Sequence, residues 1–201
     1  MKADPAGIPA LYERHARAFD EARGRSLFER GWLDDFAALV RPGGRVLDLG
    51  CGSGEPIARD LIRRGFRLTG IDTSPTLIGL CRERFPGEEW RVADMRGLAL
   101  GRTFDGLLAW DSFFHLAADD QRAIFSVFRA HAAPGAPLLF TTGPAAGEAI
   151  GAFQGEPLYH ASLAPNEYRS LLAGHGFEVV RHVAEDPECG GHTVWLARLL
   201  S

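Results

Sequence analysis

The sequence predicts an α/β fold in which helices cover both faces of a mostly parallel sheet. Short apolar runs alternate with stretches of helical periodicity along the chain. Only about ten residues separate the last two runs, too few for a crossover helix, so these two strands should be antiparallel. A length of 201 residues suits a single domain with a sizeable core.

Each element is expected from its own local pattern. Seven strands are predicted at residues 45–50, 66–72, 89–93, 104–110, 138–142, 177–183 and 193–199. Helices are predicted at residues 10–40, 56–64, 75–84, 119–131 and 165–173. Ser74 should cap the third helix, because Pro75 then occupies its first position. Residues 143–164 hold four glycines and two prolines, which predicts a long loop that acts as a lid or contacts substrate.

Composition narrows the class of protein. The net charge is −4 and no run of five like charges occurs, which disfavours a nucleic-acid partner. Cys51, Cys81 and Cys189 are few, odd in number and far apart, so neither a disulfide framework nor a CxxC metal site is expected. The first residues lack the apolar core of a signal peptide, and no apolar run reaches membrane-spanning length. We therefore expect a soluble, cytoplasmic protein without a membrane partner.

A glycine-rich turn, VLDLGCGSGE, follows the first strand and ends at Glu55. The dinucleotide pattern G-x-G-x-x-G, counted from Gly50 and Gly52, requires its third glycine at position 55, whereas the third glycine here is Gly54. An acidic side chain at that point would oppose a pyrophosphate bound at the helix N-terminus. The turn therefore favours a cationic or zwitterionic ligand.

This turn, with Asp48 before it and acids after the next two strands, resembles the first motif of class I S-adenosylmethionine-dependent methyltransferases of the small-molecule type. The resemblance extends over about residues 40–200. It implies a Rossmann-like seven-stranded sheet of order 3-2-1-4-5-7-6 with strand seven antiparallel, and S-adenosylmethionine as cofactor with S-adenosylhomocysteine as product. The cofactor-binding residues that it implies are Asp48, Gly50, Cys51, Gly52, Gly54, Asp72, Thr73, Ser74, Asp94, Met95, Trp110 and Tyr12.

The resemblance also implies roles for some of these residues. Asp48 orients the cofactor, and the glycines let the main chain approach it. Asp72, at the end of the second strand, accepts the two ribose hydroxyls. Asp94 takes the adenine amino group, and the Met95 N–H lies beside the ring. Taken alone, Asp94 could equally be a helix cap or a loop acid.

The methyl acceptor is less well defined. The segment from Asp111 to Phe114 lacks the two prolines that amino-methylating enzymes of DNA carry at this place. The fifth strand ends without the carboxylate of metal-dependent catechol enzymes, so no metal is expected. Because the sulfonium is already a good leaving group, a general base is optional. The candidates are His115, His160 and His192, whereas His131, His175 and His182 are expected to be structural.

The predicted function is methyl transfer to O, N or S of a small molecule, by a monomer or homodimer. The predicted layout is a helical cap over 1–40, a cofactor half over 41–142, the lid at 143–164 and the last two strands within 165–201. Two alternatives stay open: a nicotinamide or nucleotide-sugar oxidoreductase, and a non-catalytic protein that binds a cofactor or partner on the same fold.

Overall fold

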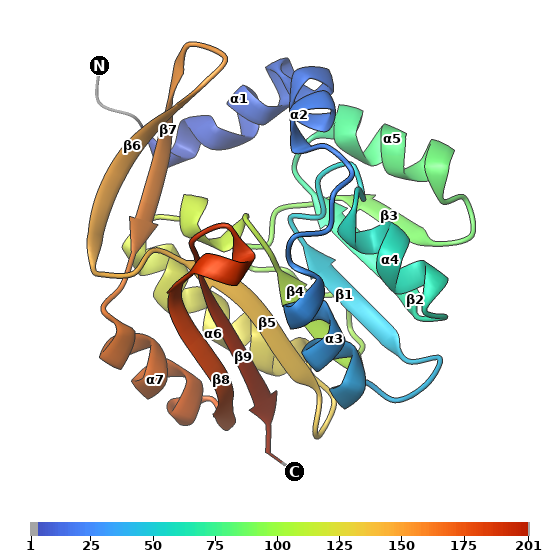
Figure 1. The fold of residues 1–201 in the computed structure, drawn as a ribbon, viewed down its shortest axis with the longest axis vertical. Coiled ribbons are helices and arrows are strands. Elements are labelled where there is room, and N and C mark those ends of the chain that lie inside the picture. Colours follow the sequence, from blue (N-terminus) through green and yellow to red (C-terminus); the bar gives the residue numbers. More distant parts are fainter. Residues whose placement is uncertain (1–3, 201) are drawn as a thin grey trace.

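The computed structural model describes residues 4–200, whose helices lie on both sides of a central sheet (Figure 1). Seven strands form this sheet in the order β3-β2-β1-β4-β5-β9-β8. They are β1 (Arg45–Leu49), β2 (Arg67–Asp72), β3 (Glu89–Val92), β4 (Gly106–Ala109), β5 (Pro137–Thr142), β8 (Phe177–Asp186) and β9 (His192–Leu199). The predicted sheet and its order are confirmed, with β8 and β9 as the predicted sixth and seventh strands.

Strand directions also agree with the prediction. β1 pairs in parallel with β2 and β4, and β5 is parallel to β4. β9 is antiparallel to both of its neighbours, β5 and β8. Only the short helix η3 (Pro187–Cys189) and its flanking turns join β8 to β9, and such a short connection permits only antiparallel pairing. β8 itself continues to Asp186, past its predicted end at residue 183.

Helices pack on both faces of the sheet, with α3, α4 and α5 on one face and α6 and α7 on the other. Their bounds are α3 (Arg30–Leu39), α4 (Ile57–Arg63), α5 (Pro75–Arg84), α6 (Ala118–His131) and α7 (Pro165–Gly174). Successive side chains of a strand point to opposite faces. Leu138 and Phe140 of β5 therefore belong to one core, and Leu139 belongs to the other. With both faces covered, the central strands are apolar throughout.

The N-terminal segment is divided, whereas the sequence predicts one helical stretch over 10–40. It contains η1 (Pro5–Gly7), α1 (Ile8–Arg14) and α2 (Ala16–Arg23) before α3 begins. Gly24 ends α2 with a φ of +66°, a conformation that glycine adopts without strain. In Figure 1, α1 and α2 lie between the hairpin β6–β7 and α5, over the end of the sheet where the parallel strands finish.

The segment 143–164 is a β-hairpin, and the predicted long loop is wrong. It consists of β6 (Gly147–Phe153) and β7 (Glu156–Ser162), paired antiparallel outside the main sheet. Gln154 and Gly155 join the strands with φ angles of +50° and +77°, the left-handed pair that a tight two-residue hairpin turn requires. β6 is almost wholly exposed. It therefore lacks the apolar alternation that would have identified a strand in the sequence.

Two observations bear on the environment of the chain. Each helix within residues 4–200 is too short or too polar to cross a lipid bilayer. Cys51, Cys81 and Cys189 are all free thiols. Burial raises the pKa of the Cys189 thiol to about 12, so this cysteine is protonated at neutral pH.

Candidate functional site

The glycine-rich turn between β1 and α4 forms the floor of the site. The Gly50 N–H donates to the Ile71 carbonyl at 2.8 Å, which folds the turn back onto β2. Gly50, Gly52 and Gly54 have φ angles of +80°, +55° and +76°, which other residues rarely adopt. A Cβ atom on Gly50 would lie 2.3 Å from Ser112 Cβ. The turn thus needs its glycines, and its main chain borders a cavity on the open side.

Asp72 ends β2 beside this turn. Its carboxylate accepts the Gly52 N–H at 3.0 Å and the Ser74 N–H at 2.9 Å. Burial raises the pKa of Asp72, although these hydrogen bonds favour its charged form. A carboxylate offers about four lone-pair positions, so two remain for a ligand. Ser74, also predicted to contact the cofactor, does not line this cavity. It caps α5, as predicted, because its Oγ accepts the Leu77 N–H at 3.1 Å.

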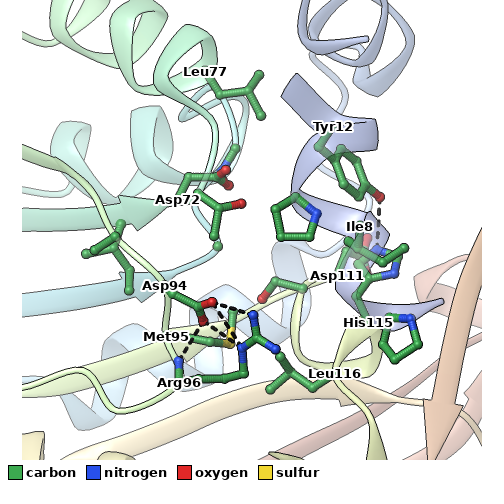
Figure 2. A pocket seen from close by; sticks show the side chains of 18 of the residues that line it. Ile8, Tyr12, Asp72, Leu77, Asp94, Met95, Arg96, Asp111, His115 and Leu116 are labelled. Atoms are coloured by element: carbon green, nitrogen blue, oxygen red, sulfur yellow. Dashed lines mark hydrogen bonds and ion pairs between the residues drawn. The ribbon is translucent and has the colours of Figure 1, made fainter. Parts of the chain in front are cut away.

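A first chamber of about 770 Å³, partly open to solvent, separates these groups from α1 (Figure 2). Five of the predicted cofactor residues outside the glycine turn line it: Tyr12, Asp72, Thr73, Asp94 and Met95. Apolar side chains complete its walls, among them Ile8, Ile71, Leu77, Ala93 and Leu116. An apolar slot with a carboxylate that retains free lone pairs fits a nucleoside, whose base is flat and whose ribose carries hydroxyl groups.

Asp94 is already paired at the wall of this chamber (Figure 2). Its carboxylate accepts the Arg96 N–H at 2.8 Å and the Arg96 guanidinium at 2.6 Å. Burial raises the pKa of Asp94, but the hydrogen bonds from Arg96 lower it by more, and the net pKa lies below the usual value. Asp94 is therefore an ionised acceptor. Its bond to the main chain two residues on also fits a loop acid, so both interpretations stay open.

Asp48 lies behind the glycine turn and is 4% exposed. Burial, together with the charge of Asp72, raises its pKa from 3.8 to about 7. Burial likewise raises the pKa of the neighbouring Cys51 thiol. The site therefore holds a carboxyl group that changes its protonation state near neutral pH.

A second chamber adjoins the first. Both are lined by Tyr12, Phe19, Gly50, Gly52, Asp111 and His115. The second chamber is further lined by Arg23, Asp48, Cys51, Gly54, Glu55, Ile57, Trp110, Phe114, His160 and His192. The predicted cofactor residues other than Ser74 are thus divided between two adjoining chambers, and all three candidate bases border the second.

The three candidate histidines differ in what their ring nitrogens contact. His115 Nδ1 donates to the Tyr159 carbonyl at 2.9 Å and Nε2 accepts from the Tyr12 hydroxyl at 2.9 Å. Burial lowers the pKa of His115 to about 4, so its ring is neutral. Burial also raises the pKa of Tyr12, so its hydroxyl remains a donor. Figure 2 shows this pair at the edge of the first chamber.

His192 is held at both nitrogens. Nδ1 donates to the Cys189 carbonyl at 2.8 Å, and Nε2 lies 3.1 Å from the Asp111 carboxylate. The hydrogen bond to Asp111 raises the pKa of His192. His160 of β7, in contrast, is half-buried and forms no hydrogen bond to any side chain or main-chain group of residues 4–200. Burial lowers the pKa of His160, so its ring is neutral at pH 7.

Comparison with known proteins agrees with this geometry. Residues 46–135 match the family model of the methyltransferase domain. The magnesium-protoporphyrin O-methyltransferase of Rhodobacter capsulatus is 36% identical over 109 residues, 51% of this chain and 46% of that protein. A ubiquinone biosynthesis O-methyltransferase of Xanthomonas campestris pv. campestris is 32% identical over 117 residues, 55% and 48% of the two chains. The chain thus spans about half the length of these relatives.

A solved structure extends the match to the whole fold. The 1,6-didemethyltoxoflavin-N1-methyltransferase of Burkholderia thailandensis, crystallised with 1,6-didemethyltoxoflavin and S-adenosylhomocysteine, has a TM-score of 0.77 and 18% identity. The match covers 100% of this chain and 92% of that one. Residues 46–135 thus match a methyltransferase domain, and the whole chain has the fold of this solved methyltransferase.

The role predicted for Glu55 is wrong. Glu55 was expected to oppose an anionic ligand with its charge. Its carboxylate is instead buried and ion-paired with Arg59, whose Nε lies 2.7 Å from Oε1. The two residues lie four apart, at the start of α4, where side chains on one helix face meet. The position of Gly54, and not the charge of Glu55, therefore separates this turn from the dinucleotide pattern.

Several residues that line the chambers have no role assigned from the sequence. Asp111 follows β4 with a φ of +49°, a strained conformation for a residue other than glycine. Its place at the end of a parallel strand was the available signal. Phe19 packs 3.0 Å from the position of a Cβ on Gly52. Arg23 also borders the second chamber. Nothing in the local pattern around Phe19 or Arg23 indicates that α2 returns to the sheet.

The other histidines lie away from both chambers, as the sequence predicts. His131, His175 and His182 each donate from Nδ1 to a main-chain carbonyl, at 2.8 to 2.9 Å. His182 also stacks on Trp195, with ring centres 3.5 Å apart. These contacts account for the three side chains without a ligand.

Proposed function

We propose that this protein is a methyltransferase that uses S-adenosylmethionine to methylate O, N or S of a small molecule. The observation that carries the proposal is that the glycine turn, Asp72 and Asp94 border one chamber, next to a second one with an unpaired histidine. The relatives support it. The Burkholderia enzyme was crystallised with a small heterocycle and S-adenosylhomocysteine, and the Rhodobacter relative is named an O-methyltransferase.

Each end of the cofactor has a proposed partner. Asp72 has two free lone-pair positions for the ribose hydroxyls, and Asp94 faces the apolar slot for the adenine. The open main chain at Gly50 and Gly52 borders the methionine part. Bound S-adenosylmethionine supplies a methyl group on a positively charged sulfur, and the carboxyl of Asp48 behind the turn favours a cation there.

The remaining work of the chain is to position the acceptor and to exclude water. We assign a lid role to α1 and the hairpin β6–β7, because the tip of the hairpin packs on the helix. Phe153 stacks on Tyr12, with ring centres 6.1 Å apart. Glu156 pairs with Arg14 at 2.5 Å and with His15 at 2.6 Å. These contacts link the two elements across the chambers.

We assign proton removal to His160 for acceptors that lose a proton. A general base must be neutral and must have a free nitrogen. His115 and His192 use both nitrogens in hydrogen bonds within the protein. His160 uses neither with any group of residues 4–200, and its lowered pKa keeps it neutral. Of the three histidines predicted as candidates for the general base, we therefore propose His160.

Calorimetric titration tests the cofactor. The ligand-free protein should bind S-adenosylmethionine and S-adenosylhomocysteine but not NAD. Binding of NAD alone would replace the proposal with an oxidoreductase. Binding of the sulfur compounds without turnover on a broad panel of phenols, amines and thiols would favour a non-catalytic binding protein.

A second experiment tests His160. The variant His160→Gln should lower kcat for acceptors that ionise only at high pH and remove the acidic limb of the pH–rate profile. His175→Gln, outside the chambers, is the matched control and should leave both unchanged. An unaltered profile in His160→Gln would exclude this histidine as the base.

The proposal also includes a cytoplasmic location, small-molecule rather than nucleic-acid acceptors, and a monomer or homodimer. The three free thiols support a reducing compartment. The acidic net charge of −4 supports the choice of acceptor.

A further inference from the structure

The second chamber has few polar groups left for a ligand. The Asp111 carboxylate contacts His192, and His192 in turn donates to the Cys189 carbonyl. The hydroxyl of Tyr12 donates to His115. Because these groups already contact one another, they are not free to recognise an acceptor without first losing a bond.

Apart from Asp48, whose carboxyl we assign to the cofactor, two polar side chains of this chamber have no partner among residues 4–200. His160 is one, and the indole of Trp110 is the other. Trp110 is 4% exposed, and its Nε1–H is buried without a partner in the described part of the chain. A buried donor left without a partner destabilises the fold. Trp110 lines the chamber, so a ligand group that reaches this N–H would supply the missing partner.

The other three tryptophans each have a hydrogen-bond partner for Nε1–H, so the missing partner is specific to Trp110. Trp32 Nε1 donates to Asp186 at 2.8 Å, Trp90 Nε1 to the Phe85 carbonyl at 3.0 Å, and Trp195 Nε1 to Thr142 at 3.0 Å. Trp110 alone, of the four in the sequence, lacks a partner.

Apart from Asp48, the charged side chains that border the chamber are matched in pairs. Arg23 pairs with the buried Glu29, and Glu55 pairs with Arg59. Asp111 pairs with His192. A phosphate or polycarboxylate acceptor would have to compete with one of these pairs, so the chamber favours an acceptor without a strong charge.

Aromatic rings supply the remaining surface. Trp110 stacks on His192 with ring centres 5.7 Å apart and an interplanar angle of 24°. The ring centres of Phe114 and His115 lie 5.2 Å and 4.9 Å from the ring centre of His160. Walls of this kind suit a flat ring, because aromatic faces and edges attract one another.

We propose that the acceptor is an uncharged aromatic or heteroaromatic compound that carries both an ionisable O–H or N–H and a ring carbonyl oxygen. Trp110 Nε1–H donates to the carbonyl oxygen, and His160 accepts the ionisable proton. In the transfer, the acceptor atom forms its bond to the methyl carbon and passes its proton to His160, while the carbon–sulfur bond breaks and leaves its electron pair on sulfur. This inference rests on the proposed function and adds the class of acceptor.

The test compares ligands by calorimetry in the presence of saturating S-adenosylhomocysteine. Lumazine and 7-hydroxycoumarin carry both features, 2-naphthol lacks the carbonyl oxygen, and succinate and ethanolamine lack a ring. We expect the first two to bind at least tenfold more tightly than the other three. Trp110→Phe, which keeps an aromatic ring but removes the donor, should weaken lumazine about tenfold and leave 2-naphthol unchanged. Trp32→Phe, which removes a paired indole N–H outside the chamber, is the matched control.

Each outcome has a distinct meaning. Equal affinity for all five compounds, or no effect of Trp110→Phe on lumazine, would overturn the inference while S-adenosylhomocysteine still binds. Weaker S-adenosylhomocysteine binding in Trp110→Phe would assign the indole N–H to the cofactor and also overturn it. If S-adenosylhomocysteine fails to bind the unaltered protein, the proposed function itself fails. A melting curve for each variant separates these results from misfolding.

Discussion

Replacing Asp48 with asparagine should stabilise the ligand-free protein at alkaline pH. Burial and the charge of Asp72 raise the pKa of Asp48 from 3.8 to about 7. Between pH 3.8 and about pH 7, the folded state therefore retains a proton on Asp48 that the unfolded chain has lost. The free energy of unfolding falls as the pH rises through this range. Each tenfold change in an ionisation constant is worth about 1.4 kcal/mol, so the charged carboxylate lowers the free energy of unfolding by about 4 kcal/mol above pH 7.

Urea unfolding of the two proteins, followed by circular dichroism across this pH range, measures the effect. The Asp48→Asn protein should exceed the wild type by about 4 kcal/mol near pH 8, and the gap should close toward pH 4. Asp105→Asn is a control of opposite sign. Burial raises the pKa of Asp105, but hydrogen bonds from Arg41 and the Arg45 N–H lower it by more, so this variant should lose stability near pH 8. A gap for Asp48→Asn that does not change with pH would refute the reasoning.

Three further substitutions test other parts of the structure. Asp72→Ala should raise the Kd for S-adenosylhomocysteine by roughly 5- to 150-fold, because hydrogen bonds worth about 1–3 kcal/mol lose their acceptor; an unchanged calorimetric Kd would show that the acid is misassigned. Glu156→Gln removes an exposed ion pair, so the melting temperature should hardly change, while stopped-flow dissociation of S-adenosylhomocysteine should accelerate if the hairpin is a lid. Phe140→Ala, fully buried against Trp195, should lower the free energy of unfolding in urea by about 3–5 kcal/mol; a loss under 1 kcal/mol would contradict the packing described for that core.

The parts of the fold that were predictable have local causes. The cap of α5 follows from Ser74 and Pro75, and the antiparallel last strand follows from the length of its connection. The hairpin was missed because β6 is exposed on both faces, so burial imposes no alternation on its sequence. Its turn at Gln154 and Gly155 is a signal that could have identified it.

The candidate site divides in a similar way. Glycines and acids at the ends of the parallel strands could be predicted, because topology alone brings those ends together. Arg23 and Phe19 could not, since they reach the site through the tertiary path of α2. Nor could the sequence rank the histidines. Their rank as general bases depends on which ring nitrogens already contact a carbonyl, a hydroxyl or a carboxylate, as those of His115 and His192 do.

The hydrogen bonds of His115 have a further consequence. They join Tyr12 of α1 to the main chain of Tyr159 in β7, and Tyr12 borders both chambers. A ligand that repositions Tyr12 in one chamber alters the state that a second ligand meets in the other. Thermodynamic linkage makes this effect reciprocal. If the bound cofactor changes the affinity for the acceptor by some factor, the bound acceptor changes the affinity for the cofactor by the same factor. Tyr12 alone would therefore couple the binding of the two substrates.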